Sequence, residues 1–246
     1  MPAYDDSMLD GPVRFDTTRW SVVRRAGASD DEGSADAALD SLCRTYWPAV
    51  VAYLRRRGYG REEARDLAQA FFATLVEKDW ISRADSERGS FRAFLVTLLR
   101  RFAANEAEAA QALKRGGGER FVFLDAGDDG AIDAPDDAAT PDEAFDRAWV
   151  RALLDGVLAR LQEEYRTAGQ GARFEQLVHH LVPGEKPPPF AAMAEELGLA
   201  EASCRVAVFR ARRRYRDLLR DGIAGTVGER GEVDDELAAL LGVLSR

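Results

Sequence analysis

Apolar residues recur along most of the chain at intervals of three and four positions, the spacing that one face of an α-helix produces. No proline interrupts residues 49–134, and apolar and polar residues do not alternate strictly there. The pattern predicts three helices, over residues 39–54, 61–78 and 90–113. Because strands require a period of two, this half of the chain is expected to be helical.

Helical spacing resumes near residue 140. Thr140 suits an N-cap, because its hydroxyl can accept a hydrogen bond from the first turn, and Pro141 suits the position that follows. A shorter helix is predicted over residues 172–181. The segment PGEKPPP at 183–189 then indicates a stiff hinge.

The strongest local pattern lies in residues 190–220, where Gly198 separates two helical stripes. The predicted inward residues are Phe190, Met193, Ala194 and Leu197 in the first stripe, and Cys204, Val208, Ala211, Tyr215 and Leu218 in the second. Glycine tolerates the left-handed backbone that a tight turn requires. The spacing therefore predicts a helix-turn-helix.

The outer face of the second of these helices is basic, with seven arginines and one aspartate between residues 205 and 220. Side chains near its start would enter a major groove, and later arginines would meet phosphates. The groove candidates are Ser203, Arg205, Val206 and Arg210, and the phosphate candidates are Arg212, Arg213, Arg214 and Arg216. A merely solvated face is the alternative. The coincidence of turn glycine, inner stripe and basic face favours DNA binding.

Acidic charge is concentrated elsewhere. The 246 residues hold 34 Lys and Arg against 43 Asp and Glu, a net charge of -9. Nine carboxylates and no basic residue lie between 125 and 146, so the remainder is neutral overall. With the glycines of KRGGGER, this predicts a flexible acidic linker over 114–142. An electrostatic cover for the basic face of 205–220 is the alternative.

Several function classes are disfavoured. The longest runs without a charged residue are ten residues, too short to span a membrane, and the acidic N-terminus does not resemble a secretory signal. A cytoplasmic protein is expected. Two cysteines and an adjacent histidine pair provide too few ligands for structural zinc. No phosphate loop or nucleophile with a nearby histidine is apparent, so neither enzyme activity nor a cofactor is expected.

A family resemblance rests on three segments. AEELGLAEASCRVAVFRARRRYRDLL resembles the DNA-binding fourth region of bacterial sigma-70-family factors, in particular the small two-domain extracytoplasmic-function type. YWPAVVAYLRRRGYGREEARDLAQAFFATLVEK and RGSFRAFLVTLLRRFAANEAE resemble the second region. The resemblance covers residues 39–108 and 188–220, in the family's order.

The resemblance implies an all-α protein of two helical domains joined by the acidic linker. Residues 39–113 would form a domain like sigma region 2, and residues 143–223 one like region 4, with the helix-turn-helix at 190–220. An N-terminal extension would occupy residues 1–38, and a C-terminal amphipathic helix residues 224–246.

Site residues follow from the same resemblance. The expected contacts with core RNA polymerase are Asp66, Gln69, Phe72 and Glu77. The expected contacts with the promoter's -10 element are Arg88, Arg92, Arg100, Arg101 and Asn105. The segment EAEAAQAL departs from the family's arginine-rich continuation, and its glutamates would oppose phosphate.

The implied function is to direct core RNA polymerase to promoters, with recognition and melting at -10 by the first domain and recognition at -35 by the second. The free protein is expected to be monomeric. Control by an anti-sigma protein, by a kinase or by the C-terminal helix is left open. The alternative is a stand-alone helix-turn-helix regulator whose N-terminal bundle dimerises or senses a ligand, and an adaptor that binds only proteins is a minor one.

Overall fold

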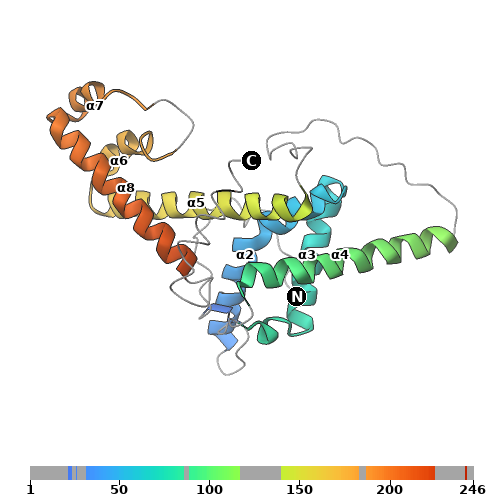
Figure 1. Ribbon diagram of the computed structural model, residues 1–246. Helices are drawn as coiled ribbons and strands as arrows, with labels where there is room; N and C mark the ends of the chain where they lie inside the picture. Colours follow the sequence, from blue (N-terminus) through green and yellow to red (C-terminus); the bar gives the residue numbers. More distant parts are fainter. Residues whose placement is uncertain are drawn as a thin grey trace.

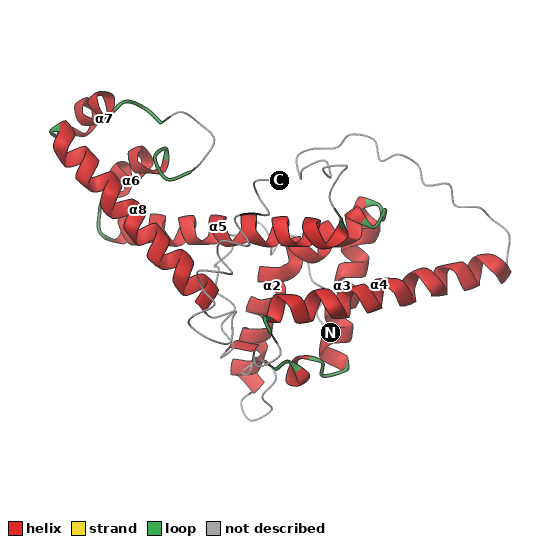
Figure 2. Cartoon of the chain, viewed as in Figure 1, coloured by secondary structure: helices red, strands yellow, loops and turns green. Residues whose placement is uncertain are grey.

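The structure is a computed structural model that describes residues 22–23, 26, 32–85, 89–116, 140–182, 187–224 and 242. Every regular element in these residues is helical, which confirms the predicted all-α fold (Figure 2). The elements are α2 (Glu32–Arg56), α3 (Arg61–Glu77), the 3-10 helix η2 (Ile81–Arg83), α4 (Phe91–Gly116), α5 (Pro141–Thr167), α6 (Gly171–Val178), α7 (Phe190–Leu197) and α8 (Glu201–Ala224). Most of the predicted extension 1–38, linker 114–142 and C-terminal helix 224–246 lies outside the described residues.

Helices α2, α3 and α4 form a bundle (Figure 1), and its core is rich in aromatic side chains. The Tyr46 ring of α2 is fully buried, and its centre lies 5.6 Å from that of Phe91 on α4 in an edge-to-face arrangement. Phe71 of α3 makes a similar contact with Phe102 of α4 at 5.5 Å. Such pairs stabilise a core beyond the area they bury. The apolar stripes predicted along these three helices therefore meet one another.

Helix α5 begins where its capping residues predict. The Thr140 hydroxyl accepts a hydrogen bond from the backbone N–H of Glu143 at 3.2 Å, and the Glu143 carboxylate accepts one from the N–H of Thr140 at 2.7 Å. Pro141 follows in the first turn, where its missing N–H has no partner to lose. The predicted N-cap is confirmed. From this start the helix runs for 27 residues, or about 40 Å.

The length of α5 lets it contribute to both halves of the molecule (Figure 1). The rings of Phe145 and Trp149 stack on Tyr46, each with its centre 6.3 Å away, and both are buried in the N-terminal core. Farther along, the helix contacts α6 and α8. The family resemblance implies that this helix belongs to the C-terminal domain, residues 143–223. The structure shows that its first half packs against α2 as well.

The C-terminal unit has the predicted helix-turn-helix. Gly198 has φ of +63°, a left-handed conformation, and the N–H of Leu199 donates to the carbonyl of Ala194 at 2.9 Å. Short side chains let α7 and α8 approach closely. The buried core of the C-terminal unit consists of Leu177, Met193, Ala194, Cys204, Ala207, Val208 and Ala211. The turn glycine and the inner stripe are therefore confirmed.

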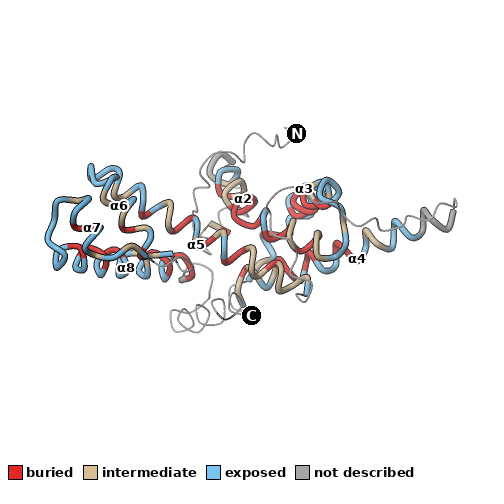
Figure 3. The backbone as a smooth tube through the Cα atoms, turned by 90° about the horizontal axis from the view of Figure 1, so that it is seen from above, coloured by how far each residue is buried: buried red, intermediate tan, exposed pale blue. Residues whose placement is uncertain are grey.

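The C-terminal ends of α8 and α4 differ in burial (Figure 3). The last turns of α8 place Leu218, Leu219 and Ile223 in the larger core. By contrast, the C-terminal part of α4 extends away from the bundle (Figure 1), and residues 104–111 are mostly exposed. Of the two glutamates in EAEAAQAL, Glu108 is exposed on this projection, whereas Glu106 is half-buried. Among the described residues, no helix has the length and apolar character to cross a membrane.

Candidate nucleic-acid interface

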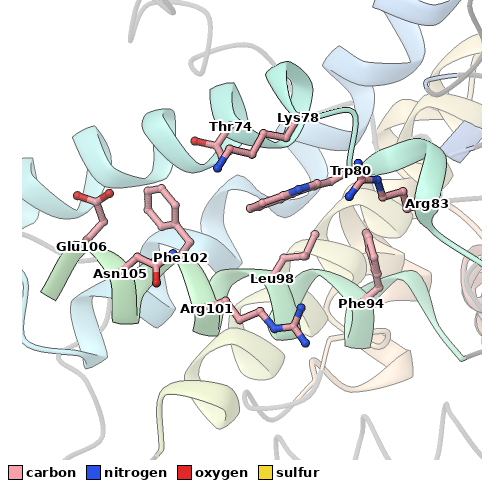
Figure 4. A pocket seen from close by; sticks show the side chains of 10 residues that line it. All are labelled: Thr74, Lys78, Trp80, Arg83, Phe94, Leu98, Arg101, Phe102, Asn105 and Glu106. Carbon is pink, nitrogen blue, oxygen red and sulfur yellow. The ribbon is translucent and has the colours of Figure 1, made fainter. Parts of the chain in front are cut away.

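A pocket lies between the end of α3, η2 and the middle of α4 (Figure 4). Its volume is about 410 Å³. Its walls combine aromatic rings with cationic side chains and a few other polar groups. The lining residues are Thr74, Lys78, Trp80, Arg83, Phe94, Leu98, Arg101, Phe102, Asn105 and Glu106.

The turn after α3 positions one wall of this pocket. Asp79 has φ of +47°, a left-handed conformation that aspartate tolerates better than most residues. Its carboxylate accepts a hydrogen bond from the Ser82 hydroxyl at 2.7 Å. The N–H of Trp80 donates to the carbonyl of Leu75 at 3.1 Å, which reverses the chain. The turn presents the Trp80 ring to the pocket, with the Lys78 ammonium 5.5 Å from the ring centre.

The chemistry of the pocket suits an unpaired nucleotide. Trp80 and Phe94 offer ring faces or edges, and single-stranded bases stack on such rings whatever their sequence. Lys78, Arg83 and Arg101 are exposed cations that can meet the adjoining phosphates. At the other end lies Glu106 (Figure 4), whose carboxylate can accept a hydrogen bond from an exocyclic base amine.

The structure divides the predicted -10 residues between two faces of α4. Arg101 and Asn105 line the pocket. Arg92 and Arg100 face α5 instead, where Arg92 pairs with Asp146 and Arg100 with Asp142. The last candidate, Arg88, lies outside the described residues.

The two ion pairs to α5 have different surroundings. Side chains in the Arg92 pair are only 17% and 23% exposed, and the Arg92 guanidinium lies 6.0 Å from the centre of the Trp149 ring. The Arg100 pair is exposed. Hydrogen bonding to Asp142, and then the charge of that carboxylate, raises the pKa of Arg100. The paired carboxylates come from the acidic segment. Two of its nine members therefore meet α4, whereas the electrostatic-cover alternative assigns them to α8.

Eight of the ten pocket residues are not among the -10 candidates predicted from the sequence, and three of these come from one short segment. Lys78, Trp80 and Arg83 come from the segment KDWISR, directly after α3. An aromatic residue between cations, immediately after an amphipathic helix, is the local signal that could have identified them. Their position opposite Arg101 depends on the packing of α3 against α4.

The predicted polymerase contacts lie on α3. Asp66, Gln69 and Glu77 are exposed. Phe72 is only 7% exposed, and its ring stacks on that of Trp47 at 5.9 Å. Phe72 therefore holds the helix in place, and the polar residues form the outer surface.

The predicted DNA face of the helix-turn-helix is solvent-accessible. Every candidate is exposed: Ser203, Arg205, Val206, Arg210, Arg212, Arg213, Arg214 and Arg216. Arg214 makes two hydrogen bonds to the Glu164 carboxylate of α5, at 2.6 and 2.9 Å. The hydrogen bond from Arg214, which opposes the effect of burial, lowers the pKa of Glu164. Arg214 therefore links α8 to α5 in this structure.

Arg205 is held at the start of α8 by two neighbours. Its guanidinium carbon lies 4.8 Å from the centre of the Phe190 ring, and Glu201 accepts a hydrogen bond from it at 3.3 Å. The Phe190 ring also stacks on His180 at 4.9 Å. The carbonyl of His180 accepts a hydrogen bond from Arg212 at 3.1 Å. These contacts restrict the side chains that would approach DNA first.

The two cysteines are buried and unpaired. Burial, and then the nearby Asp40 carboxylate, raises the pKa of the Cys43 thiol to about 12. The thiol is therefore protonated at neutral pH, and a thiolate for metal binding is disfavoured. Cys204 lies in the helix-turn-helix core, as its place in the apolar stripe predicts.

The helices that build the pocket also match a known protein family. Residues 42–112 match the family model of sigma-70 region 2. The match spans most of α2, all of α3 and η2, and most of α4. This match supports the interpretation of the chain as a sigma-70-family factor. Such a factor takes part in promoter recognition and transcription initiation and binds core RNA polymerase. No curated protein and no solved structure gives a significant match.

Proposed function

We propose that the protein is a sigma factor of the small two-domain extracytoplasmic-function type, which directs core RNA polymerase to promoters. The observation that supports this proposal is that the segment matching region 2 forms a pocket lined by aromatic rings and cations. The helix-turn-helix, which lies outside the matched segment, supplies the second element that such a factor needs.

In this proposal the pocket captures an unpaired base of the -10 element. Trp80 stacks on the base, Arg101 meets a neighbouring phosphate, and Asn105 offers both a donor and an acceptor. Trapping an unpaired base favours the melted duplex over the closed one, because the bound state exists only after melting. The protein acts by binding and catalyses no covalent reaction.

The helix-turn-helix binds the -35 element. Its second helix, α8, enters the major groove with Arg205 and Arg210 near base edges, while Arg212, Arg213 and Arg216 meet phosphates. Arg214 joins the phosphate contacts on release from Glu164. The protein acts in the cytoplasm as a monomer until it binds polymerase, and control by an anti-sigma protein or a kinase belongs to the same proposal.

Core polymerase docks on the outer surface of α3 in this proposal. Asp66 and Gln69 lie one turn apart and are exposed, so a partner helix can contact both. The test is co-elution of the full chain with core RNA polymerase in size-exclusion chromatography. We expect wild type to co-elute and an Asp66→Ala, Gln69→Ala double variant to fail. The matched control is Glu175→Ala on α6, also exposed, which should co-elute like wild type.

A wild-type chain that never co-elutes would contradict the proposal. Dimeric wild type bound to a palindrome would then favour the stand-alone regulator. Loss of co-elution by the Glu175→Ala control as well would remove α3 as the specific docking surface.

The pocket has its own test. Trp80→Ala should weaken binding of a single-stranded -10 oligonucleotide by about 1 to 3 kcal/mol, because a base-stacking ring is removed. Val76→Ala is the control, since Val76 is exposed near the end of α3, four positions before Trp80, without lining the pocket. Fluorescence anisotropy with holoenzyme measures both. Equal affinity of wild type and Trp80→Ala would exclude the pocket as the base site.

A further inference from the structure

Two large apolar side chains are exposed to solvent on the basic face of α8. Phe209 is 63% exposed and Val206 is 49% exposed, and Phe209 is the most exposed large apolar residue in the described part of the chain. Single exposed apolar residues are common on protein surfaces. Two neighbouring apolar residues exposed on the outer face of a basic helix are less common, and they suggest a binding role.

Helical geometry places this pair opposite the core. Cys204, Val208 and Ala211 are buried on the inner side of α8. Val206 and Phe209 are three positions apart, so they are neighbours on one face, and that face is turned from the inner stripe. They add nothing to the packing of the helix-turn-helix, and the fold alone does not explain them.

Arginines surround the apolar pair. Arg210 follows Val206 by four positions, and Arg205 and Arg213 lie four positions either side of Phe209, so each is a neighbour on the helix surface. All three are exposed. An apolar protein partner would have to cover these cations and remove their water, which is costly without matching carboxylates. A polyanion, by contrast, satisfies them.

DNA offers both kinds of contact in one groove. The phosphates meet arginines, and the C5-methyl group of thymine is the apolar group that base pairs present in the major groove. Val206 and Phe209 are separated by about 4.5 Å along the helix axis, close to the 3.4 Å between successive bases of one strand. The pair is therefore spaced to contact thymines at neighbouring base pairs.

We propose that Val206 and Phe209 contact thymine methyl groups in the major groove and give the helix-turn-helix a preference for thymine at those positions. The inference rests on the proposed DNA-binding function and adds the base that is read and the residues that read it. Phe209 becomes a specificity-determining residue, whereas Arg213 contributes affinity without reading sequence.

Replacement of thymine by deoxyuridine tests this directly, because it removes the methyl group and keeps the base-pairing edge. A preferred duplex is first selected from random sequences by the full chain assembled with core polymerase. Each thymine in that duplex is then replaced in turn. Wild type should lose roughly three- to fivefold in affinity at each contacted thymine, the effect of burying one methyl group, and nothing elsewhere.

Protein variants complete a double-mutant cycle. Phe209→Ala should bind the thymine and deoxyuridine duplexes equally at its position, while Phe209→Leu keeps part of the difference. Arg213→Ala is the matched control on the same face, and it should weaken both duplexes alike and reduce the salt dependence. Because these side chains are exposed, thermal unfolding should not change.

The outcomes separate the inference from the function on which it rests. Specific binding in which every deoxyuridine replacement is neutral overturns the thymine contact and leaves the proposed function intact. Failure to select any sequence overturns both. A dimer that Phe209→Ala converts to monomer, with unchanged discrimination of thymine, assigns the apolar pair to a second copy of the chain and overturns the inference.

Discussion

The arginines of α4 and α8 have similar chemistry and different surroundings. On α4, Arg92 and Arg100 are paired with carboxylates of α5. On α8, Arg210 and Arg213 are exposed and turned away from the rest of the molecule. The comparison shows that the availability of a basic side chain depends on the element that packs opposite it, and not on the helix that carries it.

The pairing on α4 follows from the direction of α5. Asp142 meets Arg100 and Asp146 meets Arg92, so the two helices run antiparallel where they touch (Figure 1). Asp142 lies in the first turn of α5, where negative charge is favourable for the helix dipole. Trp149, one turn beyond Asp146, is buried against Tyr46 and holds this arrangement. On α8, Arg214 makes a comparable link to Glu164 of α5.

The largest expected effect comes from removing the ring that joins α5 to the N-terminal core. Trp149 is 1% exposed, and Trp149→Ala should lower the free energy of unfolding by about 3 to 5 kcal/mol. Urea unfolding followed by circular dichroism measures this. Trp80→Ala is the control, because Trp80 is only partly buried and should cost less. A loss of under about 1 kcal/mol for Trp149→Ala would show that α5 does not stabilise the bundle.

A smaller effect should distinguish the two α4 ion pairs. Asp146→Asn leaves a part-buried guanidinium with a neutral partner and should cost about 1.5 to 3 kcal/mol, the range for a hydrogen bond to a charged group. Asp142→Asn affects an exposed pair and should cost below about 1 kcal/mol. The same unfolding experiment compares them. Equal losses would mean that burial does not separate the pairs.

Releasing both arginines should change DNA binding more modestly. In an Asp142→Asn, Asp146→Asn double variant, Arg92 and Arg100 each lose the charge of the α5 carboxylate with which they pair, so single-stranded DNA should bind several-fold tighter. Two added phosphate contacts would steepen the logarithmic salt slope by about 1.4. Anisotropy titrations at several salt concentrations measure this.

Arg213→Ala, on the exposed basic face of α8, is the matched control for this titration. It should leave binding of the single strand unchanged and reduce the slope for duplex DNA by about 1. An unchanged single-strand slope in the double aspartate variant would show that the α5 carboxylates do not withhold these arginines from DNA.

The smallest effect concerns pH and the support of the α8 face. Burial, followed by the charges of Arg212 and His179, lowers the pKa of His180 from its ordinary 6.5. The unfolded chain therefore binds this proton at higher pH than the folded chain does. The resulting stability is complete above pH 6.5 and is lost as the pH falls toward the lowered pKa.

Unfolding free energies measured from pH 7.5 to 5.5 should show this decline. His180→Phe preserves an aromatic ring against Phe190 and should flatten the curve in this range. His179→Gln, at the exposed neighbouring position, should retain the decline. A His180→Phe curve parallel to wild type would assign the decline to other groups.

Much of the local structure could be predicted from short stretches of sequence. Thr140 and Pro141 mark the start of α5 because a hydroxyl cap and a proline act within one turn. Gly198 marks the helix-turn-helix because few other residues adopt its left-handed backbone at low cost. The inner stripes of α7 and α8 follow the helical period. Each of these features depends on neighbours within a few residues.

The candidate site could be predicted only in part. Arg101 and Asn105 are identified by resemblance and do line the pocket. Trp80 is not among the predicted residues: the aromatic ring between cations in KDWISR is a local signal for base stacking, but only the packing shows that this turn faces α4. The resemblance predicts Phe72 as a polymerase contact, whereas stacking on Trp47 of α2 buries its side chain. The resemblance identifies the helix, but its packing determines which side of it is available.

The helical class, the N-cap of α5, the tight turn of the helix-turn-helix and the basic outer face of α8 can be predicted without a structure, because they depend on backbone preferences and periodicity within a few turns. Three features required the packing of the helices: α5 joins both cores, Arg92 pairs with Asp146 across 54 positions, and Trp80 meets α4 across a pocket. Those contacts depend on how helices pack in three dimensions, and helical periodicity shows which face is apolar without showing which partner covers it.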